Sequence, residues 1–327
     1  MGCGIIKTEN KILQRPTDHK LISIRSFIKI SKNSNKSQYK ILKKIGKGSF
    51  SIVYLCSHKI TSKKSAVKVI DKSSLSTEQI DKVQRIKEVA ILSTLDHPNI
   101  IKCYEVFEDG DYIIISEEYI SGGNLYNFFR SKSFKIPEYM IASILMQILS
   151  GLTYCHDRNI VHRDIKLENI FIELDSEVCV KIGDFGSAII KEPERSIIGF
   201  FGSLMYMPPE LLTDHYNEKI DIWSCGVLLY VLVFGKSPYF STSDQELMNE
   251  ITYNQLTSNR EELQILQKDL LSLFEGLLNL DPDKRFSANE ALMHHWLQKF
   301  TKCEETVHSH LPSKCRISES SIQYKRL

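Results

Sequence analysis

Short runs of apolar residues, several of them alternating with polar ones, recur between residues 39 and 119. A period of two residues is typical of β-strands that bury one face. One further segment, 78–95, has apolar residues at helical spacing, and Pro98 disfavours its continuation. Asp109-Gly110 favours a tight hairpin turn. This part of the chain is therefore predicted to be β-rich with one main helix, and its strands are expected at 39–45, 51–58, 65–71, 100–108 and 112–119.

Beyond residue 120 the pattern becomes helical. Residues 137–159 form one long segment with an apolar stripe, and 221–234 and 266–280 carry similar stripes. A run of strands followed by a run of helices favours an α+β fold. We therefore expect a small β-rich unit followed by a larger helical unit, with the polar residues 31–38 as a linker before them.

The composition is that of an ordinary globular protein. The 327 residues are 42% hydrophobic and 25% charged. No apolar run approaches the ~20 residues of a membrane span, and the first residues lack the apolar core of a secretory signal. The eight cysteines are scattered without a CxxC pair, which favours reduced thiols over a disulfide framework or a zinc site.

Charge is distributed unevenly along the chain. Residues 1–38 hold eight Lys or Arg and two Asp or Glu, and residues 298–327 hold six and three. Because the net charge of the whole chain is only +2, the body between these ends is acidic. An acidic body favours basic partners and argues against nucleic acid as the main ligand.

Two glycines, Gly46 and Gly48, lie between two predicted strands. Glycines in such a turn let the backbone approach phosphates closely and donate N–H groups to them. A dinucleotide-binding fold would open a helix at this point, whereas here a strand follows. Lys68 is predicted to face opposite to Val67 and Val69, and an inward lysine under a glycine turn needs an anionic partner.

Glu88, in the predicted helix, is the natural carboxylate for that lysine. Each of these charges alone is more readily interpreted as a solvated side chain. Taken together with the glycine turn, they favour a phosphate-binding site.

The stretch HRDIKLEN (162–169), followed by DFG at 184–186, resembles the catalytic core of eukaryotic protein kinases. The resemblance covers residues 39–297 and implies a bilobal fold, with an N-lobe at 39–118 and a C-lobe at 119–297 between basic tails at 1–38 and 298–327. It implies ATP and Mg²⁺ as cofactors and phosphoryl transfer to protein hydroxyl groups.

The resemblance also implies a role for each residue of the motifs. Asp164 would accept the proton of the substrate hydroxyl, and Lys166 would contact the γ-phosphate. Asn169 and Asp184 would hold two magnesium ions. Lys68, fixed by Glu88, would hold the α- and β-phosphates. The nucleotide would further contact Ile45, Gly46, Gly48, Val53 and Ala66, with the backbone of Glu118 and Ile120 at the adenine edge.

Other motif positions would be structural or would contact the substrate. His162 is expected to be a packing residue and Arg163 to reach toward the activation segment. Asp221 would support the backbone of the catalytic loop. Glu210 and Arg285 would form a buried ion pair. Ser203, with Lys166, favours Ser or Thr substrates, and Glu168 would bind basic residues near the target.

Several positions depart from the kinase pattern. Gly199 stands where many relatives carry a phosphorylatable residue, so we expect no requirement for phosphorylation there, with Ser196 the nearest alternative. Glu117 stands at the rear of the nucleotide pocket, where it would either compete for Lys68 or turn away. Ser51 replaces the third glycine of the turn. Asn124 replaces a glutamate that helps bind basic substrates, so a weaker basic preference is expected.

Within the family, the chain resembles the calcium/calmodulin-dependent group, especially calcium-dependent protein kinases, but without their EF-hands. In DPDKRFSANEAL (281–292), Phe286 and Leu292 stand where a calcium loop needs Gly and Glu, so direct calcium binding is not expected. The 30 residues after Leu297 are too few for an EF-hand pair; they are expected to be a disordered end, with an inhibitory or partner-binding segment as the alternative.

The start, MGCG, resembles an acylated terminus, with Gly2 myristoylated and Cys3 palmitoylated, although Ile6 stands where the motif has Ser or Thr. The expected location is cytoplasmic and peripheral at membranes. Two other activities stay open: a pseudokinase scaffold and, less favoured, a small-molecule kinase.

Overall fold

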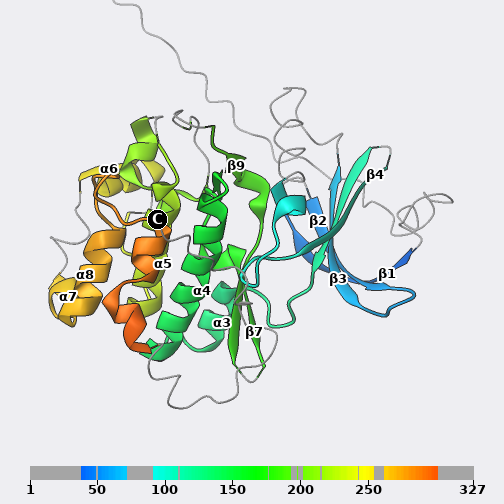
Figure 1. Cartoon of the computed structure of the whole chain (residues 1–327), viewed down its shortest axis with the longest axis horizontal. Coiled ribbons are helices and arrows are strands. Elements are labelled where there is room, and N and C mark those ends of the chain that lie inside the picture. The colour runs from blue at the N-terminus through cyan, green and yellow to red at the C-terminus, as the bar shows by residue number, and fades with distance from the viewer. Residues whose placement is uncertain are drawn as a thin grey trace, which may run out of the picture.

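The computed structural model describes two lobes, a β-sheet lobe and a mostly helical lobe (Figure 1). This confirms the predicted α+β, bilobal fold. Among the described residues no helix is both long and apolar enough to cross a bilayer. The cysteines among them are all free thiols. The described residues are 38–48, 51–71, 91–109, 111–175, 177–192, 197, 202–213, 216–241, 243–253 and 261–300.

The small lobe is built on one antiparallel sheet with the strand order β1-β2-β3-β5-β4. Its strands occur where the apolar pattern predicts them, although the fourth begins later than expected because residues 101 and 102 are not in strand conformation. The strands are β1 (Tyr39–Lys47), β2 (Ser51–His58), β3 (Lys64–Asp71), β4 (Cys103–Asp109) and β5 (Tyr112–Glu118).

The two faces of this sheet have different partners. Val67 and Val69 pack with Tyr54, Cys56 and other residues in a small cluster on one face. Lys68 alternates with these valines and lies opposite Ile115, which belongs to the main core shared with the large lobe. The predicted orientation of Lys68 is thus confirmed: it lies on the face of the sheet that is directed toward the large lobe.

The predicted helix at 78–95 is described only at its end, where residues 91–94 are helical. Ile91 and Leu92 are buried in the main core. Glu88 lies outside the described residues.

The large lobe is organised around two long helices, α4 (Glu138–His156) and α5 (Lys219–Phe234). Most side chains of α5 are buried, including Trp223, because other elements surround it. The chain is also helical at 295–300. The other α-helices described in this lobe include α3 (Leu125–Ser131), α6 (Asp244–Tyr253), α7 (Glu261–Gln264), α8 (Lys268–Leu277) and α9 (Ala288–Leu292).

Two small strand pairs lie against these helices and carry the polar motifs. β6 (Ile160–Val161) pairs with β9 (Ile189–Ile190), and β7 (Ile170–Leu174) pairs with β8 (Val178–Ile182). Residues 162–169 therefore form the loop between β6 and β7, and residues 183–188 follow β8.

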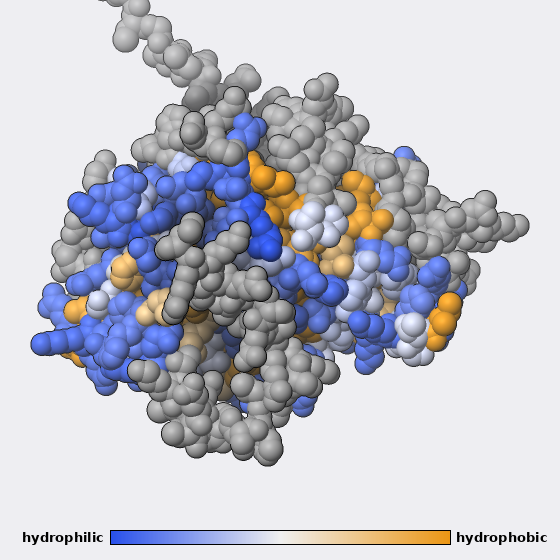
Figure 2. Space-filling model, in the orientation of Figure 1, coloured by the Kyte–Doolittle hydropathy of each residue, from blue (hydrophilic) through white to orange (hydrophobic). Residues whose placement is uncertain are grey.

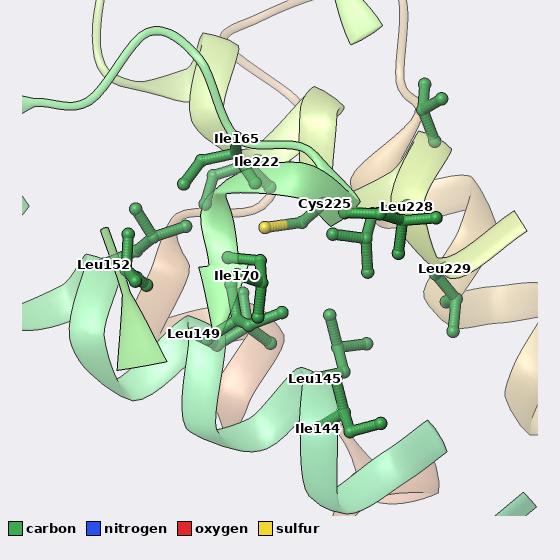
Figure 3. Packing of buried hydrophobic residues seen from close by; sticks show 14 of the residues in the cluster. Ile144, Leu145, Leu149, Leu152, Ile165, Ile170, Ile222, Cys225, Leu228 and Leu229 are labelled. Atoms are coloured by element: carbon green, nitrogen blue, oxygen red, sulfur yellow. The ribbon is translucent and has the colours of Figure 1, made fainter. Parts of the chain in front are cut away.

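Apolar side chains hold the first of these loops to the large lobe. Figure 3 shows Ile165 and Ile170 among side chains of α4 and α5, including Leu149 and Ile222. Both isoleucines are fully buried, so the polar residues between them are supported by the core.

Candidate active site

The glycine turn joins β1 to β2, as the sequence predicts. The Gly48 N–H donates a hydrogen bond to the Ser51 carbonyl at 2.8 Å, and Gly46 lies opposite Val53 in the strand register. Since β2 follows directly, the glycines do not open a helix, and a dinucleotide-binding turn is excluded. Ile45 is partly exposed beside them.

Lys68 reaches from β3 to the residue that begins the DFG motif. Its Nζ lies 3.0 Å from Asp184 Oδ1, with the lysine side chain largely buried and the aspartate half exposed. The positive charge of Lys68 lowers the pKa of Asp184, so this carboxylate is ionised near neutral pH. The two predicted residues are therefore brought together across the lobes.

The imidazole of His162 is hydrogen-bonded to neighbouring backbone groups and packs against one aromatic ring. Its Nδ1 accepts a hydrogen bond from the Asp164 N–H at 3.2 Å, so Nε2 carries the proton and donates to the Gly183 carbonyl at 3.1 Å. Phe185 packs edge-on against the imidazole with ring centroids 4.7 Å apart. This geometry agrees with the predicted packing role and leaves no nitrogen for proton transfer.

Asp221, at the start of α5, holds the backbone of the catalytic loop. Its carboxylate accepts hydrogen bonds from the N–H groups of His162 and Arg163 at 2.9 and 2.8 Å. It also lies 2.9 Å from His156 Nε2. Burial alone would raise the pKa of Asp221, but the hydrogen bond and charge of His156 and the loop N–H bond lower it. The predicted support of the loop by Asp221 is present in the structure.

Arg163 links this loop to the segment after the DFG motif. Its Nε donates to the Ser187 carbonyl at 2.6 Å, and Nη1 lies 3.3 Å from the Tyr216 hydroxyl. The backbone of Arg163 is left-handed, with φ of 66°. A Cβ at Gly202 would lie 2.5 Å from the Arg163 carbonyl oxygen, so this close approach requires glycine.

The polar centre of the site joins four predicted residues. Lys166 Nζ donates to Asp164 Oδ2 and to Ser203 Oγ, both at 2.7 Å. The Ser203 hydroxyl in turn donates to Asp164 Oδ1 at 3.1 Å. Asn169 Nδ2 donates to the Asp164 carbonyl at 2.8 Å and to its Oδ2 at 2.9 Å. These contacts fix the orientation of the Asp164 carboxylate before a substrate binds.

The orientation of Asn169 also bears on magnesium binding. Because Nδ2 makes both of those hydrogen bonds, Oδ1 is the amide atom directed elsewhere. The Asn169 carbonyl accepts from the Gly183 N–H at 2.9 Å, so this residue is tied directly to the residue preceding Asp184. An ionised carboxylate and an amide oxygen are the oxygen donors that Mg²⁺ prefers, so the donor set fits this ion.

At the end of β5 the chain crosses between the lobes through Glu118 and Ile120, the predicted adenine-contacting positions. The Glu118 carboxylate lies 3.0 Å from Lys181 Nζ on β8 and 3.3 Å from the Lys102 N–H. This ion pair was not expected from the sequence. The only signal for it is a lysine among the apolar residues of β8.

Glu117 lies on the face of the sheet that is directed toward the large lobe. It is opposite Ala66 on β3 and Cys103 on β4, in the same alternation as Lys68. Burial, followed by the charge of Glu117, raises the pKa of the Cys103 thiol to about 11. The register thus places Glu117 on the same face of the sheet as Lys68.

Glu168 and Asn124, both expected to affect substrate binding, differ in whether their side chains are free to contact a substrate. Glu168 is exposed in the turn before Asn169. Asn124 is used as the N-cap of α3, where its Oδ1 accepts from the Asn127 N–H at 3.0 Å. The position that departs from the kinase pattern therefore supplies no negative charge and stabilises a helix instead.

The predicted ion pair between Glu210 and Arg285 is present and bidentate. Arg285 Nη2 donates to Glu210 Oε2 at 3.0 Å, and Nη1 donates to Oε1. The guanidinium is buried and lies over the Trp223 ring, 5.0 Å from its centroid. It joins the end of the activation segment to α5 and the last helices.

Four other predicted positions, Gly2, Cys3, Ser196 and Gly199, lie outside the described residues.

Comparison with known proteins agrees with this geometry. Residues 39–297 match the family described as "Protein kinase domain". The chain is 35% identical over 289 residues to calcium-dependent protein kinase 4 of Plasmodium berghei (strain Anka), covering 88% of this chain and 54% of that protein. It is 34% identical over 305 residues to calcium-dependent protein kinase 4 of Plasmodium falciparum (isolate 3D7), covering 93% and 57%.

A further relative is calcium/calmodulin-dependent protein kinase type II of Caenorhabditis elegans, 31% identical over 83% of this chain and 37% of that protein. The chain thus spans little more than half the length of the calcium-dependent kinases it matches. The match covers all of the motifs that meet at the site. On this basis the chain belongs to the protein kinase family.

Proposed function

We propose that this chain transfers the γ-phosphoryl group of ATP to Ser or Thr hydroxyls of protein substrates. The observation that carries this proposal is the network of Asp164, Lys166, Ser203 and Asn169 next to the Lys68–Asp184 ion pair. It combines an oriented carboxylate, two ammonium groups and oxygen ligands for a cation, which is the set that phosphoryl transfer uses.

In the reaction, the substrate hydroxyl oxygen forms a bond to the γ-phosphorus while the bond from that phosphorus to the β,γ-bridging oxygen breaks. ADP leaves, and Asp164 accepts the hydroxyl proton. Lys166 Nζ, 2.7 Å from Asp164 Oδ2, is placed to offset negative charge on the phosphoryl group during transfer. Lys68 binds the α- and β-phosphates and so fixes the direction of the leaving group.

Asp184 and Asn169 Oδ1 would hold Mg²⁺, which when bound offsets charge on the β- and γ-phosphates. The lowered pKa of Asp184 keeps its carboxylate in the ligand form at neutral pH. Val53 and Ala66, on the cleft-facing side of the sheet, would pack on the adenine ring.

A pseudokinase would bind ATP without transferring its phosphoryl group. Among the described residues, however, each position that the chemistry requires carries the expected residue, and hydrogen bonds or ion pairs hold its side chain in place. The test is an assay of the purified full chain with Mg-ATP and a basic peptide carrying Ser, Thr or Tyr at the target position. Phosphoserine and phosphothreonine are expected, and exclusive phosphotyrosine formation would contradict the proposed specificity.

Substrates are proposed to carry basic residues near the target, with a weaker preference than usual. Glu168 is exposed next to the catalytic loop, whereas Asn124 offers no charge and is already used as a helix cap. Removing the charge with Glu168→Gln should flatten the preference for Arg in a peptide array, while Glu177→Gln on the β7–β8 turn serves as the charge-matched control. An unchanged preference for Arg would show that Glu168 does not bind the basic residues of the substrate.

The location is proposed to be cytoplasmic and peripheral at membranes, supported by the MGCG start and the basic residues 1–38. Two acyl chains, at Gly2 and Cys3, would give stable attachment where one is marginal. Gly2→Ala should move the protein to the soluble fraction of cells, and unchanged partitioning would remove this part of the proposal.

No direct calcium binding is proposed for residues 281–292, because Phe286 and Leu292 occupy positions that need Gly and Glu.

A further inference from the structure

The first strands of the small lobe carry positive charge without any compensating negative charge. Residues 38–64 contain seven lysines and no aspartate or glutamate. All seven are exposed. We call them the lysine edge: Lys40, Lys43, Lys44 and Lys47 on β1, and Lys59, Lys63 and Lys64 in and after the turn between β2 and β3.

The two groups of lysines meet at the end of the sheet where β1 begins, and the lysines of β1 continue along that strand toward the glycine turn. β1 is an edge strand of the sheet, and the Lys59 N–H donates to the Gln38 carbonyl at 2.6 Å, just before β1 begins. Lysines on an edge strand discourage pairing with other chains. That effect accounts for the lysines of β1 but not for those of the turn, so a further reason for the charge is needed.

In the part of the chain that the structure describes, the lysines of the lysine edge have no counter-charges beside them. None of its seven side chains forms an ion pair with a described residue, and Lys63 instead lies over the Tyr104 ring, 4.3 Å from its centroid. Several other lysines are paired with carboxylates, as with Lys102 and Asp96 or Lys191 and Glu218. The positive potential of this surface is therefore not neutralised within the described chain.

Apolar side chains are exposed among these lysines. Ile60 is 83% exposed in the turn between Lys59 and Lys63, and Leu42 is 44% exposed on β1. Cationic groups around exposed aliphatic side chains fit the headgroup and acyl boundary of an anionic bilayer. A surface for single-stranded nucleic acid would instead present aromatic rings for base stacking. Tyr39 and Tyr54 are buried, and the half-buried ring of Tyr104 lies beneath the Lys63 ammonium group.

The position of the surface suits a membrane-bound kinase. Residues 1–38, with their excess of basic residues, lead directly into β1. The turn precedes Ser65, which lies opposite Glu118, whereas Lys68 lies further along β3 opposite Ile115. Docking through the turn would therefore involve the end of β3 that precedes Ser65 and not the part of the strand that carries Lys68.

We infer that the lysine edge is a docking surface of the folded domain for anionic lipid bilayers. It deepens the proposed peripheral membrane location, because it provides a contact that acylation does not. Acyl chains hold the terminus, whereas the lysine edge would hold the small lobe against the bilayer and so orient the cleft.

The test uses full-length, unacylated protein and sedimentation with vesicles of phosphatidylcholine containing about 30% phosphatidylserine. The triple variant Lys59→Gln, Lys63→Gln, Lys64→Gln should reduce the partition coefficient roughly 10- to 150-fold, since each lysine near an anionic surface contributes a factor of about five. Ile60→Ser should reduce it severalfold with the charge unchanged. Both variants should keep the peptide kinase activity of the parent in solution.

The matched control is Lys132→Gln, Lys135→Gln, Lys268→Gln, which removes the same charge from exposed positions of the large lobe. Its partitioning should change less than threefold. Equal losses in the two triple variants, or equal binding to vesicles without phosphatidylserine, would overturn the inference. Tighter binding to a single-stranded oligonucleotide than to the anionic vesicles would also overturn it. Because the protein is unacylated, none of these outcomes depends on Gly2 or on catalysis.

Discussion

The Ser203 hydroxyl donates to Asp164 Oδ1 at 3.1 Å while it accepts from Lys166 Nζ at 2.7 Å. One side chain of the activation segment thus holds the two residues that act on the substrate hydroxyl and the phosphoryl group. Ser203→Ala should lower kcat about 10- to 100-fold because both partners lose an orienting contact. Ser203→Thr, which keeps the hydroxyl, should retain most of the activity in steady-state peptide assays. Equal losses in both variants would show that the hydroxyl is not what matters.

His162 is predicted to have no role in proton transfer, since both ring nitrogens are hydrogen-bonded to backbone groups. His162→Phe should lower kcat and thermal stability but leave the acid limb of the pH profile of kcat/KM in place. The measurement is that profile between pH 5 and 9 for the variant and the parent. Loss of the acid limb in the variant would assign the titrating group to His162.

Asp221 should contribute strongly to stability, because it is fully buried and accepts hydrogen bonds from two backbone N–H groups of the catalytic loop. Asp221→Ala is expected to cost about 3–5 kcal/mol of unfolding free energy, as for the loss of one partner of a buried charged pair. Urea unfolding at neutral pH measures this cost. A loss below about 1 kcal/mol would mean that the loop is held by other contacts.

The contribution of Asp221 to the free energy of unfolding depends on pH, and the sign of this dependence follows from its pKa. The folded-state pKa of Asp221 is lowered, so its contribution is present above the unfolded value of about 3.9. It is lost as the pH falls through the folded pKa. The difference in stability between the parent and Asp221→Ala should therefore be constant near neutral pH and shrink only below about pH 4.

Glu117 should weaken nucleotide binding through its charge, since it shares the cleft-facing side of the sheet with Lys68. Replacing it should lower the KM for ATP roughly two- to fivefold by removing repulsion of the phosphates and competition for the lysine. Glu117→Gln tests charge alone, and Glu117→Met tests charge with a side chain more usual at this position. Unchanged KM values in both would show that Glu117 is a bystander.

Activation is predicted not to require phosphorylation in the segment that contains Gly199. Protein treated with phosphatase, and the variant Ser196→Ala, should phosphorylate a peptide at the rate of untreated protein. Activity that appears only after Ser196 becomes phosphorylated, monitored by mass spectrometry, would refute this expectation.

The strands of the small lobe could be predicted from the sequence because apolar and polar residues alternate along them. Val67 and Val69 pack in one cluster and Lys68 lies on the other face, as a period of two requires. The motif residues could be assigned by resemblance to the kinase family, and the structure brings Asp164, Lys166, Asn169 and Ser203 together.

Contacts between distant segments could not be predicted in the same way. The pairs His156–Asp221 and Lys181–Glu118 join elements far apart in the chain, and the sequence around these residues does not show which of them will pair. The use of Asn124 as a helix cap likewise depends on where α3 begins. The sequence identifies Asn124 as a departure from the kinase pattern, and the structure shows that its side chain caps a helix.

The central claim is that the network around Asp164 transfers phosphate, rather than only holding a nucleotide. The most direct measurement compares the full chain with Asp164→Asn and Asp184→Ala for both ATP binding and transfer to a Ser peptide. We expect transfer by the parent, ATP binding without appreciable transfer by Asp164→Asn, and loss of Mg-dependent ATP binding and transfer in Asp184→Ala. Transfer by Asp164→Asn at the parental rate, or none by the parent above the Asp184→Ala background, would contradict the account.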